Sequence, residues 1–186
     1  MSKKNIPVKP NETYTLTIRD LGIHGEGIGA VDDFTVFVPG ALPGETIQAM
    51  IVTAKKSYAT GRLISIETPS AHRTTPACPV CHTCGGCQIS HLTYEGQLAV
   101  KERRVKDVMV RIGGCEESLV RPIIGAQHPW NYRNKMAVPV SQVTSGPVLG
   151  YYRQGSHQVI PIASCAIQEE ENNRLLRFAQ GFMTRH

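Results

Sequence analysis

The sequence is poor in aromatic residues and has no long hydrophobic run. Phenylalanine, tryptophan and tyrosine together make up 6% of the 186 residues, and there is one tryptophan. No apolar stretch approaches the roughly 20 residues that a helix needs to span a bilayer. The lysine-bearing start, MSKKNIPVKPNETYT, also lacks the apolar centre of a secretion signal. These absences predict a cytoplasmic protein with no membrane partner.

Acidic residues are scarce relative to basic ones. The 15 aspartates and glutamates oppose 20 lysines and arginines, which gives a formal net charge of +5. A positive surplus favours a polyanionic partner such as nucleic acid, although charge says nothing about fold. The same charge is also compatible with a merely basic surface.

Residues 13 to 66 lack a helical apolar pattern and alternate instead between apolar and polar side chains. This period of two marks half-buried strands, and turn signals such as Pro39-Gly40 separate the runs. The pattern predicts a small, five-stranded OB-like β-barrel at residues 1–67, of the kind that binds oligonucleotides. A polar, proline-bearing linker follows at 68–77. The alternating runs are Tyr14–Ile18, Phe34–Val38, Ile47–Ile51 and Leu63–Ile66.

The segment GIHGEGIGA, residues 22–30, imitates the dinucleotide fingerprint GxGxxG/A. That fingerprint needs a helix directly after it, whereas this chain continues through VDD into FTVFVPG, another predicted strand. Glu26, Asp32 and Asp33 would also repel a phosphate. We therefore expect these glycines to bend a hairpin between two barrel strands.

A helix is predicted after the cysteine-rich loop. Thr93 is placed to cap it, and Glu95 lies in its first turn near the positive end of the helix dipole. Gly113-Gly114 marks its end. Loop and helix together form the predicted segment 78–118.

Residues 119–186 return to strand patterns, at 136–140, 147–153 and 157–162, before a helix from Glu169 to about Met183. We interpret this part as an incomplete α/β central domain. The fold class as a whole is therefore a mixed, β-rich α+β protein.

Four of the six cysteines lie in ACPVCHTCGGCQ, at Cys78, Cys81, Cys84 and Cys87. In a cytoplasmic protein such a cluster favours metal binding over disulfides. Structural zinc sites usually present two CxxC pairs about 12 to 20 residues apart, so a zinc tetrahedron from one loop would be crowded. An iron-sulfur cubane spreads its ligands over several irons, which suits a tight loop joined by one distant cysteine.

Cys165 is the natural distant ligand because it follows a predicted strand far along the chain. Cys115, behind two glycines at a helix end, is expected to be a small buried hydrophobe. One loop cysteine is then spare, and the spacing does not say which. The CxxxCxxC pattern of radical enzymes that use S-adenosylmethionine is absent, and the basic composition disfavours a ferredoxin-like electron carrier.

The segment CPVCHTCGGCQISHLTYEGQLAVK, residues 78–101, resembles the cluster segment of the RNA (uracil-5-)-methyltransferases that modify 23S ribosomal RNA. The family pattern is CxxxxxCGGC, followed by glutamine, HL, tyrosine, QL and lysine. The stretch from DLGIHGEGIG through VFVPGALPGE to YATGRLISIE is similar to the family's TRAM domain, a small RNA-binding barrel. The resemblance continues through RIGG, YRNKMAVPV, GYYRQGSH and CAIQ into the family's central domain.

This resemblance implies a [4Fe-4S] cluster held by four cysteines. The implied ligands are Cys78, Cys84, Cys87 and Cys165. Cys81 stands where the family requires no cysteine, so the resemblance makes it a bystander.

Members of the family continue into a Rossmann-like domain that binds S-adenosyl-L-methionine and carries a nucleophilic cysteine and a base. That cysteine adds to C6 of a flipped-out uracil, so that C5 accepts the methyl group and 5-methyluridine forms. We expect none of this machinery in the 186 residues. The chain is interpreted as the RNA-binding, cluster-bearing N-terminal part of such an enzyme, inactive by itself. The alternative is a non-enzymatic, zinc-stabilised RNA-binding adaptor.

The predicted partner is 23S ribosomal RNA, bound by a monomer through basic and aromatic side chains. Lysine and arginine contact phosphates, and tyrosine stacks on unpaired bases. Trp130, by contrast, is expected in the core. The predicted RNA contacts are Lys55, Lys56, Tyr58, Arg62, Arg73, Arg133 and Lys135.

Overall fold

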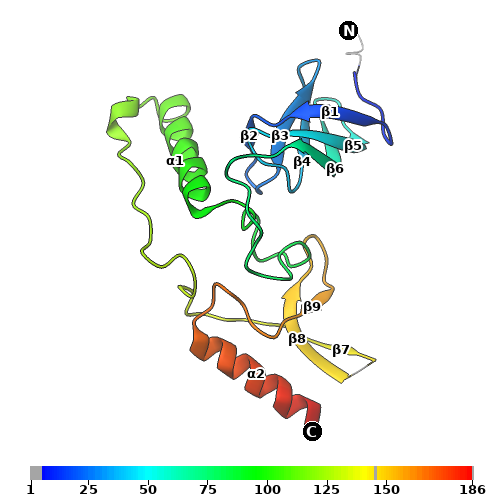
Figure 1. The fold of residues 1–186 in the computed structure, drawn as a ribbon, viewed down its shortest axis with the longest axis vertical. Coiled ribbons are helices and arrows are strands. Elements are labelled where there is room, and N and C mark those ends of the chain that lie inside the picture. Colours follow the sequence, from blue (N-terminus) through cyan, green and yellow to red (C-terminus); the bar gives the residue numbers. More distant parts are fainter. Residues whose placement is uncertain (1–5, 145, 186) are drawn as a thin grey trace. The chain divides into compact units, whose positions relative to one another are not determined.

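The computed structural model describes residues 6–144 and 146–185. It divides the chain into two compact units, whose elements are labelled in Figure 1. The first comprises the described residues of Met1–Thr75 together with His91–Val100, and the second those of Pro76–Ser90 and Lys101–His186. The mixed α+β class is confirmed, since both strands and helices are present.

The first unit is built on a six-stranded sheet in the order β1-β5-β6-β4-β3-β2. Neighbouring strands are antiparallel except β4 and β6, which run parallel. The strands are β1 (Thr13–Thr17), β2 (Asp20–Leu21), β3 (Gly27–Val31), β4 (Phe34–Val38), β5 (Thr46–Ala54) and β6 (Tyr58–Thr68).

The sheet has six strands where the sequence predicts five, because one extended run is divided between its two ends. β1 pairs with β5, and β2, which follows almost at once, pairs with β3. Between them, the amide of Ile18 donates to Glu45 O at 2.8 Å, and that of Arg19 donates to Ile28 O at 2.9 Å. The chain thus crosses from one end of the strand order to the other, which rolls the sheet back on itself as a barrel requires.

The alternating apolar residues predicted for the strands form the core. Leu16, Val36, Ile47 and Ile51 are at most 1% exposed, and they belong to one buried cluster with residues of β4, β5 and β6. Each such side chain contributes roughly 1.5–3 kcal/mol relative to an exposed position. Burial of one face of each strand accounts for the period of two.

The glycine-rich segment after β2 turns the chain as predicted and is followed by strands. Gly25 has φ of 82°, a left-handed conformation that glycine adopts without strain. The chain then enters β3 and β4. The helix that a dinucleotide site requires does not follow.

The predicted linker is tied to the barrel by a buried ion pair. Glu45 is fully buried, and its carboxylate accepts hydrogen bonds from Arg73 Nε at 2.5 Å and Arg73 Nη2 at 2.9 Å. The backbone amides of Leu42 and Ser70 donate to the same carboxylate at 2.8 and 3.2 Å. Burial alone raises the pKa of Glu45, but these donors outweigh it, so its pKa lies below its ordinary value.

The helix α1 (Tyr94–Arg111) begins where the sequence predicts. The side chain of Thr93 accepts a hydrogen bond from the amide of Gly96 at 3.2 Å, which caps the first turn. Gly114 has φ of 63° just beyond the helix, in agreement with the predicted stop. A short 3-10 helix, η1 (Glu117–Leu119), follows.

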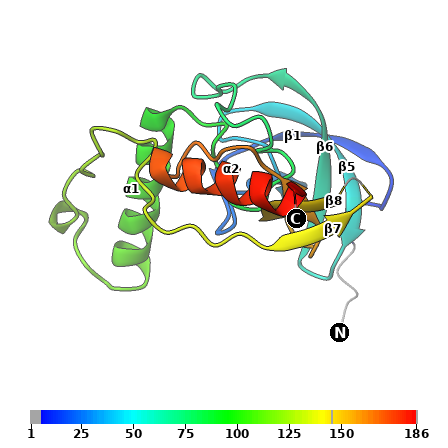
Figure 2. The ribbon, with the colours of Figure 1, turned by 90° about the horizontal axis from the view of Figure 1, so that it is seen from below.

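The second unit holds a three-stranded antiparallel sheet in the order β7-β8-β9. The helix α2 (Glu170–Arg185) packs against β8 (Figure 2). The amide of Gln180 bridges the two: its Oε1 accepts from Leu149 N at 2.9 Å and its Nε2 donates to Pro147 O at 2.7 Å. The strands are β7 (Val140–Val143), β8 (Gly146–Tyr152) and β9 (Val159–Pro161).

The strand predicted at 136–140 is wrong except for its last residue. Residues 136–139 lie outside any strand, and β7 starts at Val140. Pro139 has no amide hydrogen and cannot donate to a sheet, so the strand begins after it.

Among the described residues, no helix is both long and apolar enough to cross a membrane.

Candidate metal centre and RNA interface

The cysteine-rich loop folds into consecutive tight turns. The amide of Cys81 donates to Cys78 O at 3.3 Å, and the amides of Thr83 and Cys84 both donate to Val80 O, at 3.0 and 2.8 Å. Short polar and glycine residues favour such turns over regular structure. The turns gather closely spaced cysteines in a small volume.

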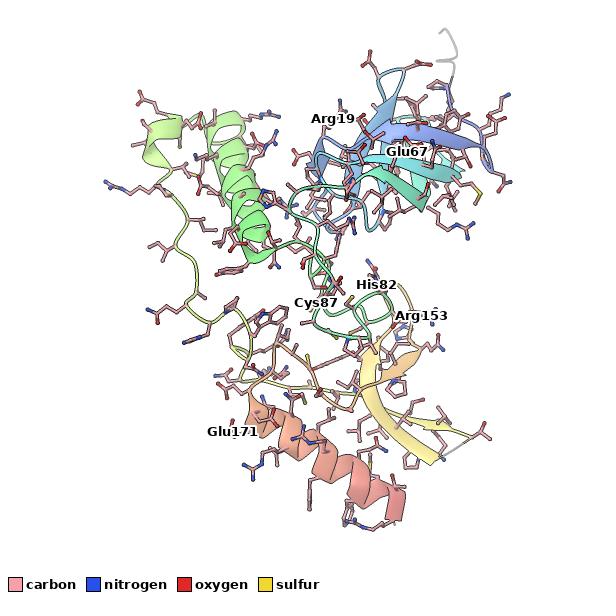
Figure 3. The ribbon with its side chains drawn as sticks, viewed as in Figure 1. Arg19, Glu67, His82, Cys87, Arg153 and Glu171 are labelled. Carbon is pink, nitrogen blue, oxygen red and sulfur yellow. The ribbon has the colours of Figure 1, made fainter. Side chains whose placement is uncertain are left out.

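The loop is fastened to the hairpin formed by β8 and β9. Cys84 forms an isolated antiparallel bridge with Arg153, and the amide of Gly85 donates to Tyr152 O at 2.9 Å. A Cβ atom at residue 85 would lie 3.2 Å from Gln154 Cα and from Tyr152 O, so glycine permits this close approach. Figure 3 shows Cys87 on this loop and Arg153 at the hairpin.

Cys165 is held in place by a buried asparagine of α2. The Oδ1 of Asn173 accepts from the amide of Cys165 at 2.8 Å, and its Nδ2 donates to Cys165 O at 3.2 Å. Asn173 is 3% exposed. Because both backbone groups of Cys165 are bound, the helix fixes where this cysteine lies.

One cavity collects the loop cysteines and Cys165. Its volume is about 460 Å³, and Cys78, Cys81, Cys84, Cys87 and Cys165 all line it. All are free thiols. The loop and the distant cysteine therefore meet, although their positions in the sequence are far apart.

Three thiols of this cavity, those of Cys81, Cys84 and Cys87, have a pKa above the ordinary value of a thiol. Burial raises the pKa of Cys87, and the nearby Cys165, Cys84, Cys78 and Cys81 raise it further. Burial raises the pKa of Cys84 too, opposed by the Gly86 amide that lies 3.4 Å from its sulfur. Several thiolates crowded together repel one another, so a compensating cation is needed to ionise them all.

The thiols do not converge on one point. In the part of the chain that the structure describes, no three cysteine, histidine, aspartate or glutamate side chains are grouped closely enough to hold a metal ion. Zinc requires four donors at about 2.0–2.3 Å from a single centre. A cubane distributes its four cysteine ligands over four separate irons, a wider arrangement.

Four of the predicted RNA contacts lie on the β5–β6 hairpin of the first unit. Lys55, Lys56, Tyr58 and Arg62 are all exposed. The ring of Tyr58 meets that of Phe37 edge-on, with centroids 5.6 Å apart. This contact holds the tyrosine on the barrel surface while leaving 38% of it accessible.

The other three predicted RNA contacts lie outside the β5–β6 hairpin. Arg133 and Lys135 line the cysteine cavity of the second unit. The amide of Arg133 donates to Ile167 O at 2.8 Å, which aligns this segment with the residues after Cys165. Arg73 is engaged by Glu45 and by Gly40 O at 2.7 Å, and its contact with RNA stays a prediction.

Several residues of the site escape sequence reasoning. Trp130, expected in the core, is 39% exposed and lines the cysteine cavity together with Tyr151. Gln168 is 1% exposed and donates to Lys135 O at 3.0 Å and Tyr151 OH at 3.3 Å. The one feature of the sequence that points to Gln168 and Asn173 as parts of the site is that both lie close to Cys165 in the chain.

Comparison with known proteins gives matches over the whole chain. Residues 7–64, which contain most of the barrel, match the TRAM domain. A protein of Bacillus cereus named as an uncharacterized RNA methyltransferase is 44% identical over 185 residues, covering 100% of this chain and 40% of the relative. One of Halalkalibacterium halodurans, named likewise, is 43% identical over 177 residues, covering 95% of this chain and 39% of the relative.

The chain belongs to the family of these RNA methyltransferases. It spans about 40% of the length of the curated relatives that it matches. Its fold is similar to that of a solved Pyrococcus abyssi tRNA (uracil-54, C5)-methyltransferase in complex with S-adenosyl-L-homocysteine. The TM-score is 0.64 at 21% identity, over 92% of this chain and 37% of that one. The likeness to this structure concerns the fold and extends over both units of the chain.

Proposed function

We propose that this chain is the RNA-binding and [4Fe-4S]-bearing part of an S-adenosyl-L-methionine-dependent 23S rRNA (uracil-5-)-methyltransferase. The observation that carries the proposal is the single cavity in which Cys165 meets the loop cysteines. The 44% identity to a protein named as an RNA methyltransferase supports the reaction class. S-adenosyl-L-methionine, the methyl donor, would be held by a part of the enzyme outside these residues.

In this proposal Cys78, Cys84, Cys87 and Cys165 ligate the cluster and Cys81 does not. The donor set fits, because free thiols from two distant segments line one cavity. Cys165 is close enough to raise the pKa of Cys84 and Cys87, but it is not among the thiols that raise the pKa of Cys81. Cys81 also has Ser90 as a hydrogen-bond partner. A bound cluster would cross-link the loop to the start of α2.

The cationic side chains at the cavity suit such a cluster. Four thiolates carry more negative charge than the iron-sulfide core neutralises, and Arg133 and Lys135 lie at the same cavity. Cations close to buried negative charge stabilise it. Arg133 and Lys135 are therefore placed to serve the cluster, an RNA phosphate beside it, or both.

RNA binding is assigned to the TRAM domain. The β5–β6 hairpin presents Lys55, Lys56 and Arg62 beside the exposed ring of Tyr58. Cationic groups attract phosphates, and an aromatic face stacks on an unpaired base. Unpaired loops of ribosomal RNA offer both features.

We expect the 186-residue chain to bind a 23S rRNA fragment but to transfer no methyl group to it. Binding should weaken steeply with salt, because each phosphate contact releases counterions. Filter binding at several salt concentrations measures the first property, and incorporation of label from S-adenosyl-L-methionine measures the second. A transfer RNA serves as the competitor in the binding measurement. Clear methyl incorporation, or no RNA binding at low salt, would contradict the proposal.

A further inference from the structure

A second cavity lies between the cysteine loop and the hairpin of β8 and β9. Its volume is about 550 Å³, within the range of small-ligand sites. It is lined by Gly85 and Gly86 on the loop, and by residues 151–157, which include the turn between β8 and β9. We call it the hairpin groove. Every residue in it belongs to the second unit, so its shape does not depend on the TRAM domain.

The hairpin groove shares residues with the cysteine cavity. Gly86 and Tyr151 line both. One wall is the glycine pair between Cys84 and Cys87, and the amide of Gly85 donates to Tyr152 O of the hairpin at 2.9 Å. The groove is therefore a built surface, formed where two segments far apart in the sequence are fastened together.

The side chains of the groove combine aromatic rings with positive charge. Tyr152 is 45% exposed, and its ring meets that of His157 edge-on with centroids 5.5 Å apart. Arg153 is exposed and forms no ion pair among the described residues. None of the described residues that line the groove carries a carboxylate. An anionic, aromatic ligand matches this chemistry.

We propose that the hairpin groove binds one unpaired nucleotide of the RNA. The base stacks on the ring of Tyr152, whose edge-on contact with His157 orients it, and Arg153 binds the adjoining phosphate. Stacking of a base on an aromatic side chain accepts any base, so this contact selects single-stranded RNA rather than a sequence. The inference rests on the proposed RNA-binding function and adds a second contact to that of the TRAM domain.

The test uses the whole chain and a fluorescein-labelled, unstructured single-stranded RNA. Tyr152→Leu should raise the dissociation constant about tenfold, since stacking is worth roughly 1–3 kcal/mol per base. Tyr152→Phe keeps the ring and should bind as the native chain does. Arg153→Gln should weaken binding and reduce the steepness of log affinity against log salt concentration by about 1, the value for one phosphate contact. Fluorescence anisotropy measures all four proteins.

Arg177→Gln is the matched control for charge. It removes one positive charge from the same unit, but Arg177 lies on α2 and pairs with Glu170 at 2.6 Å. The dissociation constant of Arg177→Gln should stay within about twofold of the native value. The circular dichroism spectrum of every variant should match that of the native chain, which shows that each one is folded.

A 2-aminopurine base in the probe reports stacking directly. Its fluorescence should be quenched by the native chain and by Tyr152→Phe, but not by Tyr152→Leu. If Tyr152→Leu and Arg153→Gln both bind with native affinity, the hairpin groove is not a nucleotide site, while the proposed RNA binding by the TRAM domain is unaffected. Absence of binding by the native chain overturns both proposals.

Discussion

Replacing Cys165 with serine is expected to remove most of the iron from the protein, whereas Cys81→Ser leaves the iron content unchanged. Both residues line the same cavity, so position alone does not distinguish them. Cys165 is fixed by two hydrogen bonds with the side chain of Asn173 and, among the described residues, is the one cysteine of the cavity that lies outside the loop. Without it a cluster has no anchor to α2. Iron per chain after anaerobic purification is the measurement.

Cys81→Ser is the matched control because it makes the same atomic change in the same cavity. Equal iron loss from both variants would show that Cys81 is a ligand and that the proposed set is wrong. Circular dichroism of the two proteins separates lost ligation from lost folding.

Arg73→Met is expected to destabilise the TRAM domain by about 3–5 kcal/mol, the cost of leaving a buried charge without its partner. The affected charge is Glu45, which is fully buried and receives two hydrogen bonds from Arg73. Arg62→Met, at an exposed position of β6, should change the free energy of unfolding by less than about 0.5 kcal/mol. Urea denaturation followed by circular dichroism compares the two. Equal, small effects would contradict the role of the ion pair.

The same pair sets a pH dependence. Since the folded-state pKa of Glu45 lies below its ordinary value of 4.5, its contribution is fully present above that value. It is lost as the pH falls through the lower folded-state pKa. The double variant Glu45→Gln/Arg73→Met should recover part of the lost stability and show a weaker dependence on pH in this acidic range.

The local features of the fold could be predicted from the sequence. Alternation in runs such as Phe34–Val38 reports burial of one strand face, and Thr93 caps a helix through contacts a few residues away. The failures involve partners distant in the sequence. β6 begins at Tyr58 rather than Leu63, because its first residues pair with β4. No pattern in the sequence reports that pairing.

The candidate site shows the same difference between local features, which the sequence predicts, and contacts between distant residues, which it does not. The loop cysteines are conspicuous by their spacing, and the position of Cys165 in the sequence already makes it the predicted distant ligand. The resemblance adds only the prediction that Cys81 is the spare loop cysteine. Nothing in the sequence indicates that Arg73 pairs with Glu45, because the two residues are 28 positions apart. The support that Asn173 gives to Cys165 depends on how α2 follows a turn, which residue types alone do not reveal.

Metal and sulfide analysis of the anaerobically purified chain tests the central claim most directly. Four cysteines from two segments bound to a cubane predict a brown protein, with broad absorbance near about 400 nm, about four irons per chain and a similar amount of acid-labile sulfide. A colourless protein with one stoichiometric zinc and no sulfide would contradict the account and favour the zinc-stabilised adaptor.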